Sequence, residues 1–434
     1  MKKIGIRYED RFTAERRVPL IPDHVKQLKE QFGIEFNVEP SEKRIFKDEE
    51  YLQAGAQLTG DFRDCEVIIG VKEIVEKWFE NEKTYIFFSH TIKGQSYNMG
   101  ILKKMIEKKV NLIDYEKITD ENGKRLIFFG KFAGLAGMID SIWALGLRLK
   151  HLGIDNPFTR LNQCYTYNSL DEAKAVVREI GEDIRKNGLP KELSPFVTGF
   201  TGYGNVSIGA QEIYDLLPVK EITPAELLEL ESKTDLPQNL LYKVVFKEEH
   251  LSVHKDGKAF DLQHYYHNPS EYESDFEQYI PKMTVLMNCM YWTADYPMIV
   301  TKDYLEKNYN KDHKLKVIGD ITCDVNGSIE CTEKGALVEN PIFVYDTDSR
   351  TIKDGHTGEG IQMMTVDILP SELPRESSEF FSHALLPFIP EIAKADYNVP
   401  FDELEIPGPI KRAMILHKGN FTPDFEYMKK FINK

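Results

Sequence analysis

Three basic side chains in the first hundred residues have the types and positions needed for proton transfer and carboxylate binding. Arg17 lies in ERRVPLIP, Lys72 directly follows the apolar run VIIGV, and His90 directly follows IFFS. Guanidinium and ammonium groups bind carboxylates, and lysine and histidine exchange protons, so the three predict a cationic pocket with an acid–base pair. The alternatives are a solvated strand end for Lys72, a structural role for His90, and a surface ion pair with Glu15 for Arg17.

Polar side chains follow other apolar runs of the chain. Glu116 comes after the run LIDY and is a candidate for orienting a catalytic His or Lys, with a solvated surface acid as the alternative. Asn288 ends the run 284–288, and Asp320 and Asp324 lie in GDITCDVNGSIE. Ligands of open α/β sheets bind beyond the carboxyl ends of strands, so we expect these positions to face a cofactor or substrate. The alternative for the two aspartates is a turn in which they cap backbone N–H groups.

A glycine-rich turn lies at the centre of the chain, in SPFVTGFTGYGNVSIGAQEIYDLLP. A short apolar strand, 196–200, leads into Gly202, Gly204 and Asn205, and a helix follows from Val206. Strand, glycine turn and helix form the phosphate-binding corner of dinucleotide folds, where the helix N-terminus offers free N–H groups. Ser207 stands where the third glycine of the usual pattern would be, so the glycines could instead only shape a surface turn.

Strand-like and helix-like segments alternate over residues 1 to about 135, and again after the glycine turn. This alternation predicts an α/β fold with parallel sheets and helices on both faces. A long apolar segment, 132–152, predicts a buried helix between domains, and a capping box at 169–172 predicts a helix to about residue 187. The polar stretch 248–279 reads as an insertion without a clear assignment.

Composition limits the possible partners. The 434 residues carry a net charge of −15, which argues against nucleic acid or anionic membrane as partners. No apolar run approaches a membrane span of about 20 residues, and the N-terminus has no signal-peptide core. The aspartate and cysteine spacings predict no metal centre. The five cysteines are odd in number and scattered, so we expect reduced thiols in a cytoplasmic protein.

Nine segments together resemble one enzyme family. They are RRVPLIPDHV, VKE, FFSHTIKGQ, LIDYEK, FFGKFAGLAGMID, TGYGNVSIGAQ, MNCMYW, GDITCDVNGSIE and LPSELPRESSEFFSHALLPFI, in this order. The chain thereby resembles the lysine–2-oxoglutarate reductase (saccharopine dehydrogenase, L-lysine-forming) family. It looks most like the N-terminal reductase domain of the bifunctional plant and animal enzyme, and more distantly like alanine dehydrogenase and transhydrogenase. The resemblance implies two Rossmann-like domains with a cleft between them. The substrate and catalytic domain would comprise 1–140 plus 345–434, and the dinucleotide domain 141–344.

The resemblance also implies chemistry, with L-lysine, 2-oxoglutarate and saccharopine as small-molecule partners. The family condenses the lysine ε-amine with the keto group of 2-oxoglutarate, and a nicotinamide hydride reduces the imine to saccharopine. Lys72 and His90 match the acid–base pair, and which of them transfers the proton stays open. Arg17 matches the arginine that binds a substrate carboxylate, and Glu116 an acid that neutralises a nearby cation. Asp324 matches an aspartate at the junction of cofactor and substrate.

The cofactor prediction is divided. The pyrophosphate turn of the family matches Gly202, Gly204 and Asn205, extended here by Val206. Glu221, about twenty residues beyond Gly202, would accept a hydrogen bond from a ribose hydroxyl and favour NAD(H). The plant and animal relatives prefer NADP(H), whose 2′-phosphate Lys220 and Lys233 could balance, and we favour NADP(H) on this ground.

Two other functions fit the sequence. One is a related amino-acid or opine dehydrogenase acting on another amino or keto acid, with its specificity set by 248–279 and MNCMYW. The other is a nucleotide sensor that keeps the dinucleotide fold without catalysis. The joint presence of Arg17, Lys72 and His90 argues against a sensor, which has no need of an acid–base pair. The sequence predicts no oligomeric state.

Overall fold

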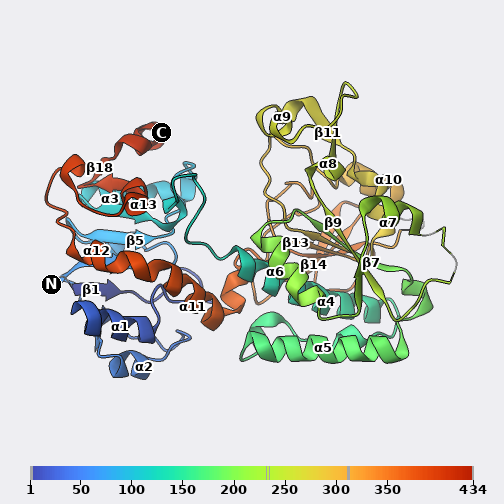
Figure 1. Ribbon diagram of the computed structural model, residues 1–434, viewed down its shortest axis with the longest axis horizontal. Coiled ribbons are helices and arrows are strands. Elements are labelled where there is room, and N and C mark those ends of the chain that lie inside the picture. Colours follow the sequence, from blue (N-terminus) through green and yellow to red (C-terminus); the bar gives the residue numbers. More distant parts are fainter. Residues whose placement is uncertain (1–2, 231, 234, 310–312, 433–434) are drawn as a thin grey trace. The chain divides into compact units, whose positions relative to one another are not determined.

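The computed structural model describes residues 3–230, 232–233, 235–309 and 313–432. Its internal contacts divide the chain into two units, each with its own sheet (Figure 1). Unit 1 comprises Met1–Phe129 and Pro374–Lys434, and unit 2 comprises Gly130–Leu373. The predicted divisions at 140/141 and 344/345 differ from these boundaries, because they would cut through a continuous helix and a continuous strand of unit 2.

The sheet of unit 1 has eight strands, six of them parallel, and the C-terminal segment adds an antiparallel pair at one edge. Its order is β18 (Asn420–Phe421), β17 (Met414–His417), β6 (Asn111–Asp114), β5 (Thr84–Phe87), β4 (Cys65–Ile69), β1 (Lys3–Ile6), β2 (Glu35–Val38) and β3 (Gln57–Leu58). All four residues of β5 and of β6 are buried, as expected of parallel strands covered on both faces.

Helices cover both faces of this sheet, with α3 and α13 on one side and α1, α11 and α12 on the other (Figure 1). The helices of unit 1 are α1 (Pro22–Phe32), α2 (Asp48–Gln53), α3 (Met99–Glu107), α11 (Pro374–Leu385), α12 (Ile389–Lys394), α13 (Gly408–Arg412) and α14 (Lys429–Ile432). Short 3₁₀ turns are η1 (Glu76–Trp78), η2 (Ser96–Asn98), η3 (Tyr115–Lys117), η11 (Leu386–Phe388), η12 (Phe401–Glu403) and η13 (Pro423–Met428). The C-terminal segment ends in the 3₁₀ turn η13 followed by the short helix α14.

The sheet of unit 2 repeats this plan, with six parallel strands and an antiparallel pair at one edge. Its order is β15 (Thr351–Asp354), β14 (Ile342–Asp346), β16 (Ile361–Met364), β13 (Val317–Asp320), β12 (Val285–Asn288), β7 (Phe196–Thr201), β9 (Leu241–Phe246) and β8 (Val219–Glu221). In unit 1 the first strand, β1, pairs with the second, β2. In unit 2 the first strand, β7, pairs with the third, β9, and the second, β8, lies beyond β9 at the sheet edge. This exchange of β8 and β9 decides which side chains lie near the glycine turn.

The helices of unit 2 are α4 (Gly130–His151), α5 (Leu170–Asn187), α6 (Asn205–Tyr214), α7 (Pro224–Leu230), α8 (Glu248–Leu251), α9 (Leu262–His267) and α10 (Lys302–Asn308). Its 3₁₀ turns are η4 (Pro157–Arg160), η5 (Cys164–Thr166), η6 (Lys191–Leu193), η7 (Pro269–Glu271), η8 (Phe276–Gln278), η9 (Ile280–Lys282) and η10 (Leu369–Glu372). The predicted cap of α5 is confirmed, because Ser169 Oγ accepts a hydrogen bond from Glu172 N at 3.2 Å. The unassigned stretch 248–279 contains α8, α9 and a small antiparallel sheet of β10 (Ser252–His254) and β11 (Tyr272–Ser274).

Helix α4 corrects the expectation that no apolar run approaches a membrane span. By length and composition it could cross a membrane, but 83% of its most apolar window is buried inside the protein. It also packs wholly within unit 2 instead of linking two domains. Its glycines explain the close packing on α6, because a Cβ on Gly134 would stand 1.9 Å from the carbonyl oxygen of Val206. A Cβ on Gly209 would likewise stand 2.1 Å from the carbonyl oxygen of Lys131. We therefore read α4 as the core helix of unit 2.

Candidate active site

The predicted catalytic residues of unit 1 all follow strands whose carboxyl ends share one edge of its sheet. β1, β4, β5 and β6 are parallel neighbours. Arg17 lies in the connection after β1, Lys72 after β4, His90 after β5 and Glu116 after β6. The fold therefore brings to one edge the loops whose residues are scattered over a hundred positions of the sequence.

Arg17 forms a buried ion pair with Glu15. Its Nε and Nη2 donate to the two carboxylate oxygens at 2.7 and 2.6 Å, and its backbone N–H donates to the first oxygen at 3.1 Å. Burial would raise the pKa of Glu15, but the Arg17 guanidinium outweighs it and holds that pKa below its ordinary value. The guanidinium also stacks 4.2 Å from the ring centroid of Phe129. The alternative of an ion pair with Glu15 therefore has the right partner, but the pair is buried and does not lie on the surface.

Lys72 lies beside a second buried acid, Glu9. The backbone N–H groups of Val71 and Lys72 donate to the two oxygens of Glu9 at 2.6 and 2.9 Å. Burial and the nearby charge of Glu15 raise the pKa of Glu9 to about 7. The Lys72 ammonium lies 5.7 Å from the ring centroid of Phe12. The end of β4 is therefore fixed through its backbone, while the ammonium group of Lys72 is partly exposed.

His90 is held in a defined orientation by Glu73, the residue after Lys72. The distance from His90 Nδ1 to Glu73 Oε1 is 2.7 Å. Burial would raise the pKa of Glu73, but the hydrogen bond and charge of His90 keep it below its ordinary value. The backbone of His90 has a φ of 47°, and Asn98 Nδ2 donates to the carbonyl oxygens of Ser89 and His90 at 3.1 and 3.3 Å. A histidine anchored at Nδ1 presents Nε2 as its exchangeable position.

Glu116 makes a different contact from the one predicted. It pairs with Arg125, and not with Lys72 or His90, among the ion pairs of the described part of the chain. Its backbone N–H donates to Asp114 Oδ1 at 2.8 Å, as part of the cap of η3. Asp114 also accepts from the backbone N–H of Ser89 at 3.1 Å, which ties the end of β6 to the loop of His90. Glu116 thus neutralises a cation, but that cation is Arg125.

The glycine turn of unit 2 has the geometry that its sequence predicts. Gly202 has a φ of 79°, and its N–H donates to the carbonyl oxygen of Phe246 at 2.9 Å. Gly204 is the N-cap of α6, and a Cβ there would meet no atom within 4 Å, so nothing inside the protein requires a glycine. Asn205 and Val206 form the first turn of α6. Open space at Gly204 and the free N–H groups of a ten-residue helix fit a pyrophosphate.

Glu221 does not lie at this turn, contrary to the prediction. It stands opposite Lys243 of β9, which in turn stands opposite Thr198, three residues before the end of β7. Its carboxylate pairs with Lys243 Nζ at 3.3 Å. The spacing rule assumes that the second strand pairs with the first, whereas here β9 takes that place. The acid that follows the neighbouring strand is Glu248.

Glu248 is a binding candidate that the sequence reasoning missed. Its Oε1 accepts from Tyr266 Oη at 2.7 Å and from Tyr203 Oη at 3.5 Å. Tyr203 lies between Gly202 and Gly204, so the carboxylate of Glu248 stands beside the glycine turn. The missed signal is LLYKVVF at 240–246, a strand-like run that ends just before KEE.

Asn288 is fully buried and its side chain serves the protein interior. Its Oδ1 accepts from Thr201 Oγ1 at 2.8 Å, and its Nδ2 donates to Asp320 Oδ1 and Ser328 Oγ, each at 2.8 Å. The predicted cofactor contact through this side chain is therefore replaced by a network that joins β7, β12 and β13. Burial raises the pKa of Asp320 within this network. Asp324 is exposed in the loop after β13, on the carboxyl edge that also carries the glycine turn.

Known proteins share the fold of this chain, and others match its sequence over almost all of its residues. Residues 5–136 match the family described as alanine dehydrogenase/PNT, N-terminal domain. The structure resembles an L-alanine dehydrogenase (TM-score 0.63, 16% identity, 99% of both chains). It also resembles a transhydrogenase from Sinorhizobium meliloti (TM-score 0.59, 15% identity, 97% of this chain and 100% of the other). These structures share its α/β fold with two largely parallel sheets.

Sequence relatives cover almost the whole chain. The chain is 38% identical to alpha-aminoadipic semialdehyde synthase of Arabidopsis thaliana over 98% of its length and 41% of the relative. The mitochondrial enzyme of that name from Mus musculus is 35% identical over 98% of the chain and 47% of the relative. The chain thus spans less than half the length of these two relatives. Saccharopine dehydrogenase [NAD(+), L-lysine-forming] of Yarrowia lipolytica is 26% identical over 91% of the chain and 93% of the relative. The resemblance drawn from the nine motifs is therefore confirmed: along nearly its whole length, this chain is a relative of the saccharopine dehydrogenases and alpha-aminoadipic semialdehyde synthases.

Proposed function

We propose that this chain is an NAD(P)-dependent lysine–2-oxoglutarate reductase, forming saccharopine reversibly from L-lysine and 2-oxoglutarate. The observation that carries the proposal is the set of paired charges at one sheet edge: Arg17 with Glu15, Lys72 beside Glu9, and His90 with Glu73. A dianionic keto acid needs such local cations in a protein whose net charge is −15. The relatives of similar length, named as saccharopine dehydrogenases, support the same reaction.

The geometry favours separate roles for the charged groups. His90, anchored at Nδ1 by Glu73, exchanges a proton at Nε2 with the carbinolamine oxygen or the imine nitrogen. Lys72 supplies positive charge for a substrate carboxylate. Arg17 uses Nε and Nη2 on Glu15, and its Nη1 side faces the remaining carboxylate of the substrate in our assignment.

The glycine turn and the start of α6 would hold the pyrophosphate of a nicotinamide dinucleotide, which supplies and accepts the hydride. Gly202 shapes the turn, Gly204 leaves room for close approach, and the N–H groups around Asn205 face the phosphates. The buried network of Asn288 keeps the strands below the turn in register. In this assignment the backbone of unit 2 holds the dinucleotide, while the side chains of unit 1 bind the substrate carboxylates and move protons.

For the cofactor we propose NAD(H) in place of the NADP(H) favoured by the sequence. A carboxylate after the strand next to the glycine turn accepts from ribose hydroxyls and repels a 2′-phosphate. Glu248 has this position, and Tyr203 and Tyr266 orient it. Lys220, one of the two lysines expected to balance a 2′-phosphate, lies on β8, the edge strand beyond β9.

The test follows nicotinamide absorbance with purified protein, L-lysine and 2-oxoglutarate, once with NADH and once with NADPH. Oxidation that needs both substrates supports the reductase, and no oxidation by protein that still binds dinucleotide would contradict it. Replacement of lysine by alanine and other amino acids separates the reductase from an opine-type dehydrogenase.

A second experiment tests the cofactor preference. Glu248→Gln should reduce the preference for NADH over NADPH by about tenfold, whereas Glu221→Gln, the matched control on β8, should leave the preference unchanged. An unchanged ratio in Glu248→Gln would remove Glu248 from this role.

A further inference from the structure

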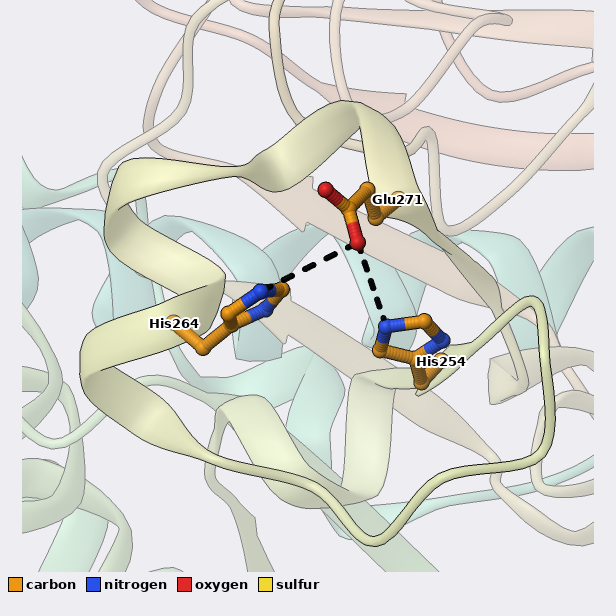
Figure 2. Close-up of side chains that lie close together, drawn as sticks. All are labelled: His254, His264 and Glu271. Atoms are coloured by element: carbon orange, nitrogen blue, oxygen red, sulfur yellow. Dashed lines mark ion pairs between the residues drawn. The ribbon is translucent and has the colours of Figure 1, made fainter.

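Three side chains with metal-ligand chemistry converge outside the candidate active site, in the excursion of unit 2 that carries β10, α9 and β11. His254 ends β10, His264 lies in α9, and Glu271 ends η7. One ligand atom of each lies within 4.8 Å of the others. Figure 2 shows the two imidazole rings pointing toward the carboxylate between them. Aspartate and cysteine spacing along the sequence did not reveal this cluster, because its members come together only through the β10–β11 pairing and the turn of α9.

The distances within the cluster match a metal site better than a hydrogen-bonded triad. His254 Nε2 lies 3.3 Å and His264 Nε2 lies 3.8 Å from the same oxygen, Glu271 Oε2. Two ligand atoms each about 2.1 Å from a tetrahedral ion lie about 3.4 Å apart. His254 Nε2 is buried and has no hydrogen-bond partner among the described residues, although it points at the carboxylate. This buried ring nitrogen makes no hydrogen bond within the described part of the chain and has two further ligand atoms within 4.8 Å, so its unmet bonding capacity fits a shared metal ion.

The surroundings fix the two rings. Tyr272 packs against both, with ring centroids 5.1 Å from His254 and 5.8 Å from His264. Tyr272 Oη donates to the carbonyl oxygen of Asp261 at 3.3 Å and lies 3.2 Å from His264 Nδ1, so that nitrogen is the donor of the pair. His264 then keeps a lone pair on Nε2, the form of the ring that binds a metal.

His254 has the opposite arrangement in the metal-free form. The backbone N–H of Asp256 donates to His254 Nδ1 at 3.1 Å, so the ring carries its proton on Nε2. Coordination through Nε2 therefore requires the proton to move to Nδ1 and the Asp256 N–H to bond to water instead. This cost makes the site weaker than one built with both histidines preset.

We propose that His254 Nε2, His264 Nε2 and Glu271 Oε2 bind a divalent transition-metal ion of the Zn²⁺ type, with water at the fourth position. Imidazole nitrogen and carboxylate oxygen are ligands that Zn²⁺ accepts in tetrahedral geometry. The cluster borders a surface pocket of about 530 Å³, which provides access for the ion and its water. The ion would tie β10, α9 and the start of β11 together, and α9 carries Tyr266, which donates to Glu248. Its role would be structural: the bound ion would cross-link the segment that carries β10, α9 and β11.

The experiment uses the whole chain after removal of metal with a chelator, and titration calorimetry measures its binding of Zn²⁺. Co²⁺ in place of Zn²⁺ reports tetrahedral coordination through its visible absorption. Because His254 is buried, the informative variants are His264→Ala and Glu271→Gln, whose side chains are 40% and 46% exposed. His267→Ala is the matched control, since His267 is an exposed histidine on the same helix whose Nδ1 hydrogen-bonds the carbonyl oxygen of Gln263.

Wild-type protein and His267→Ala should bind one Zn²⁺ with equal affinity, and the two ligand variants should bind it roughly 100-fold more weakly or not at all. The Co²⁺ spectrum should disappear in the same variants. Equal affinity in His264→Ala and His267→Ala would overturn the site, as would the absence of binding to wild type. These outcomes are independent of the reductase assay, because binding is measured without substrates or dinucleotide.

Discussion

In each sheet the candidate site residues lie at the carboxyl ends of the parallel strands, but the two sheets present different chemical groups there. Unit 1 presents charged side chains in pairs, such as Arg17 with Glu15 and His90 with Glu73. Unit 2 presents the backbone of a glycine turn, with the hydrogen-bonded network of Asn288 below it. The pKa values follow this difference, because a cation keeps Glu15 and Glu73 below their ordinary values despite burial. This difference matches the proposed division of roles, in which the unit 1 edge binds substrate and moves protons and the unit 2 edge holds the dinucleotide.

Unit 2 also buries acids, but without cations. Asp140 on α4 accepts from Cys164 N at 2.7 Å, and Glu372 of η10 accepts from Tyr165 N at 3.0 Å. Burial raises the pKa of Asp140 to about 7, and burial together with the Asp140 charge raises that of Glu372 well above its ordinary value. Their other oxygens are buried with no donor among the described residues unless the two acids share a proton. The raised pKa values favour a proton shared by Asp140 and Glu372, whereas Glu15 and Glu73 of unit 1 have lowered pKa values that favour the charged form.

The same rule covers Asp114 of unit 1, which forms no ion pair among the described residues. Asp114 accepts from Ser89 and from the backbone N–H of Glu116. Burial raises the pKa of Asp114 as it does those of the unit 2 acids. The partner, and not the unit, thus decides whether the pKa of a buried acid lies above or below its ordinary value. Four predictions test this comparison.

The largest effect should come from Lys72→Met, which removes the Lys72 ammonium group from the unit 1 edge. We expect turnover to fall about 10²- to 10⁴-fold, because proton transfer and carboxylate binding both lose a charged partner. Dinucleotide binding should stay nearly unchanged, since the glycine turn belongs to unit 2. Steady-state kinetics and a fluorescence titration with NADH measure the two quantities. Lys77→Met, at an exposed lysine of η1, is the control. Unchanged turnover in Lys72→Met would overturn the assignment of Lys72 to the catalytic site.

The next largest effect should be on the free energy of unfolding, when a buried acid is replaced by its amide. One such variant is made in each unit. In unit 1, Glu15→Gln leaves the Arg17 guanidinium buried without a counter-charge. Breaking a buried ion pair in this way costs about 3–5 kcal/mol of unfolding free energy. Urea denaturation of the variant and the wild type at pH 7 measures the loss. A change below about 1 kcal/mol would mean that solvent reaches Arg17 and that the pair is not buried in solution.

Much of the unit 1 edge could be predicted because its residues follow strands that are easy to recognise. Lys72, His90 and Glu116 each come directly after an apolar run, and parallel strands bring such positions to one edge. The partners Glu9 and Glu73 were missed because a carboxylate next to a loop has no pattern of its own. Only the tertiary structure shows that Glu73, adjacent to Lys72 in sequence, turns toward His90.

Unit 2 shows where sequence reasoning fails for a topological reason. The turn at Gly202 and Gly204 follows from local chemistry, since glycine permits the positive φ and the close approach. The acid that belongs with it depends on strand order, which spacing alone does not contain. Glu221 has the usual spacing, yet β8 lies at the sheet edge and Glu248 stands beside the turn. The Asp140–Glu372 pair joins positions more than 200 residues apart and leaves no local signal.

In unit 2, Asp140→Asn should have the opposite sign from Glu15→Gln. The folded pKa of about 7 lies above the ordinary value of 3.8, so the folded protein holds a proton that the unfolded chain releases. Stability from this group is therefore full below about pH 4 and is lost as the pH rises through 7. Asparagine keeps an acceptor for Cys164 N and gains a donor for Glu372. At pH 8 we expect the variant to be more stable than wild type, by up to about 4 kcal/mol.

Thermal unfolding from pH 5 to pH 8 measures this third prediction. The wild type should lose stability across the range and Asp140→Asn should lose less, so that their curves separate as the pH rises. Asp215→Asn is a suitable control, because Asp215 is an exposed acid of unit 2 whose partner is Lys243. Parallel curves would show that the two acids do not share a proton.

The smallest effect should come from Gly204→Ala, which tests whether the unit 2 edge works through its backbone. A Cβ there would meet no atom within 4 Å, and a φ of −78° suits any residue, so the unfolding free energy should change by less than about 0.5 kcal/mol. A dinucleotide lying against this backbone would meet the new methyl group, and its affinity should fall about tenfold. Gly134→Ala is the contrasting variant, because its Cβ would stand 1.9 Å from Val206 O and must destabilise the packing of α4 on α6. Full dinucleotide affinity in Gly204→Ala would mean that the cofactor does not approach this turn, and that the open space there has no part in binding.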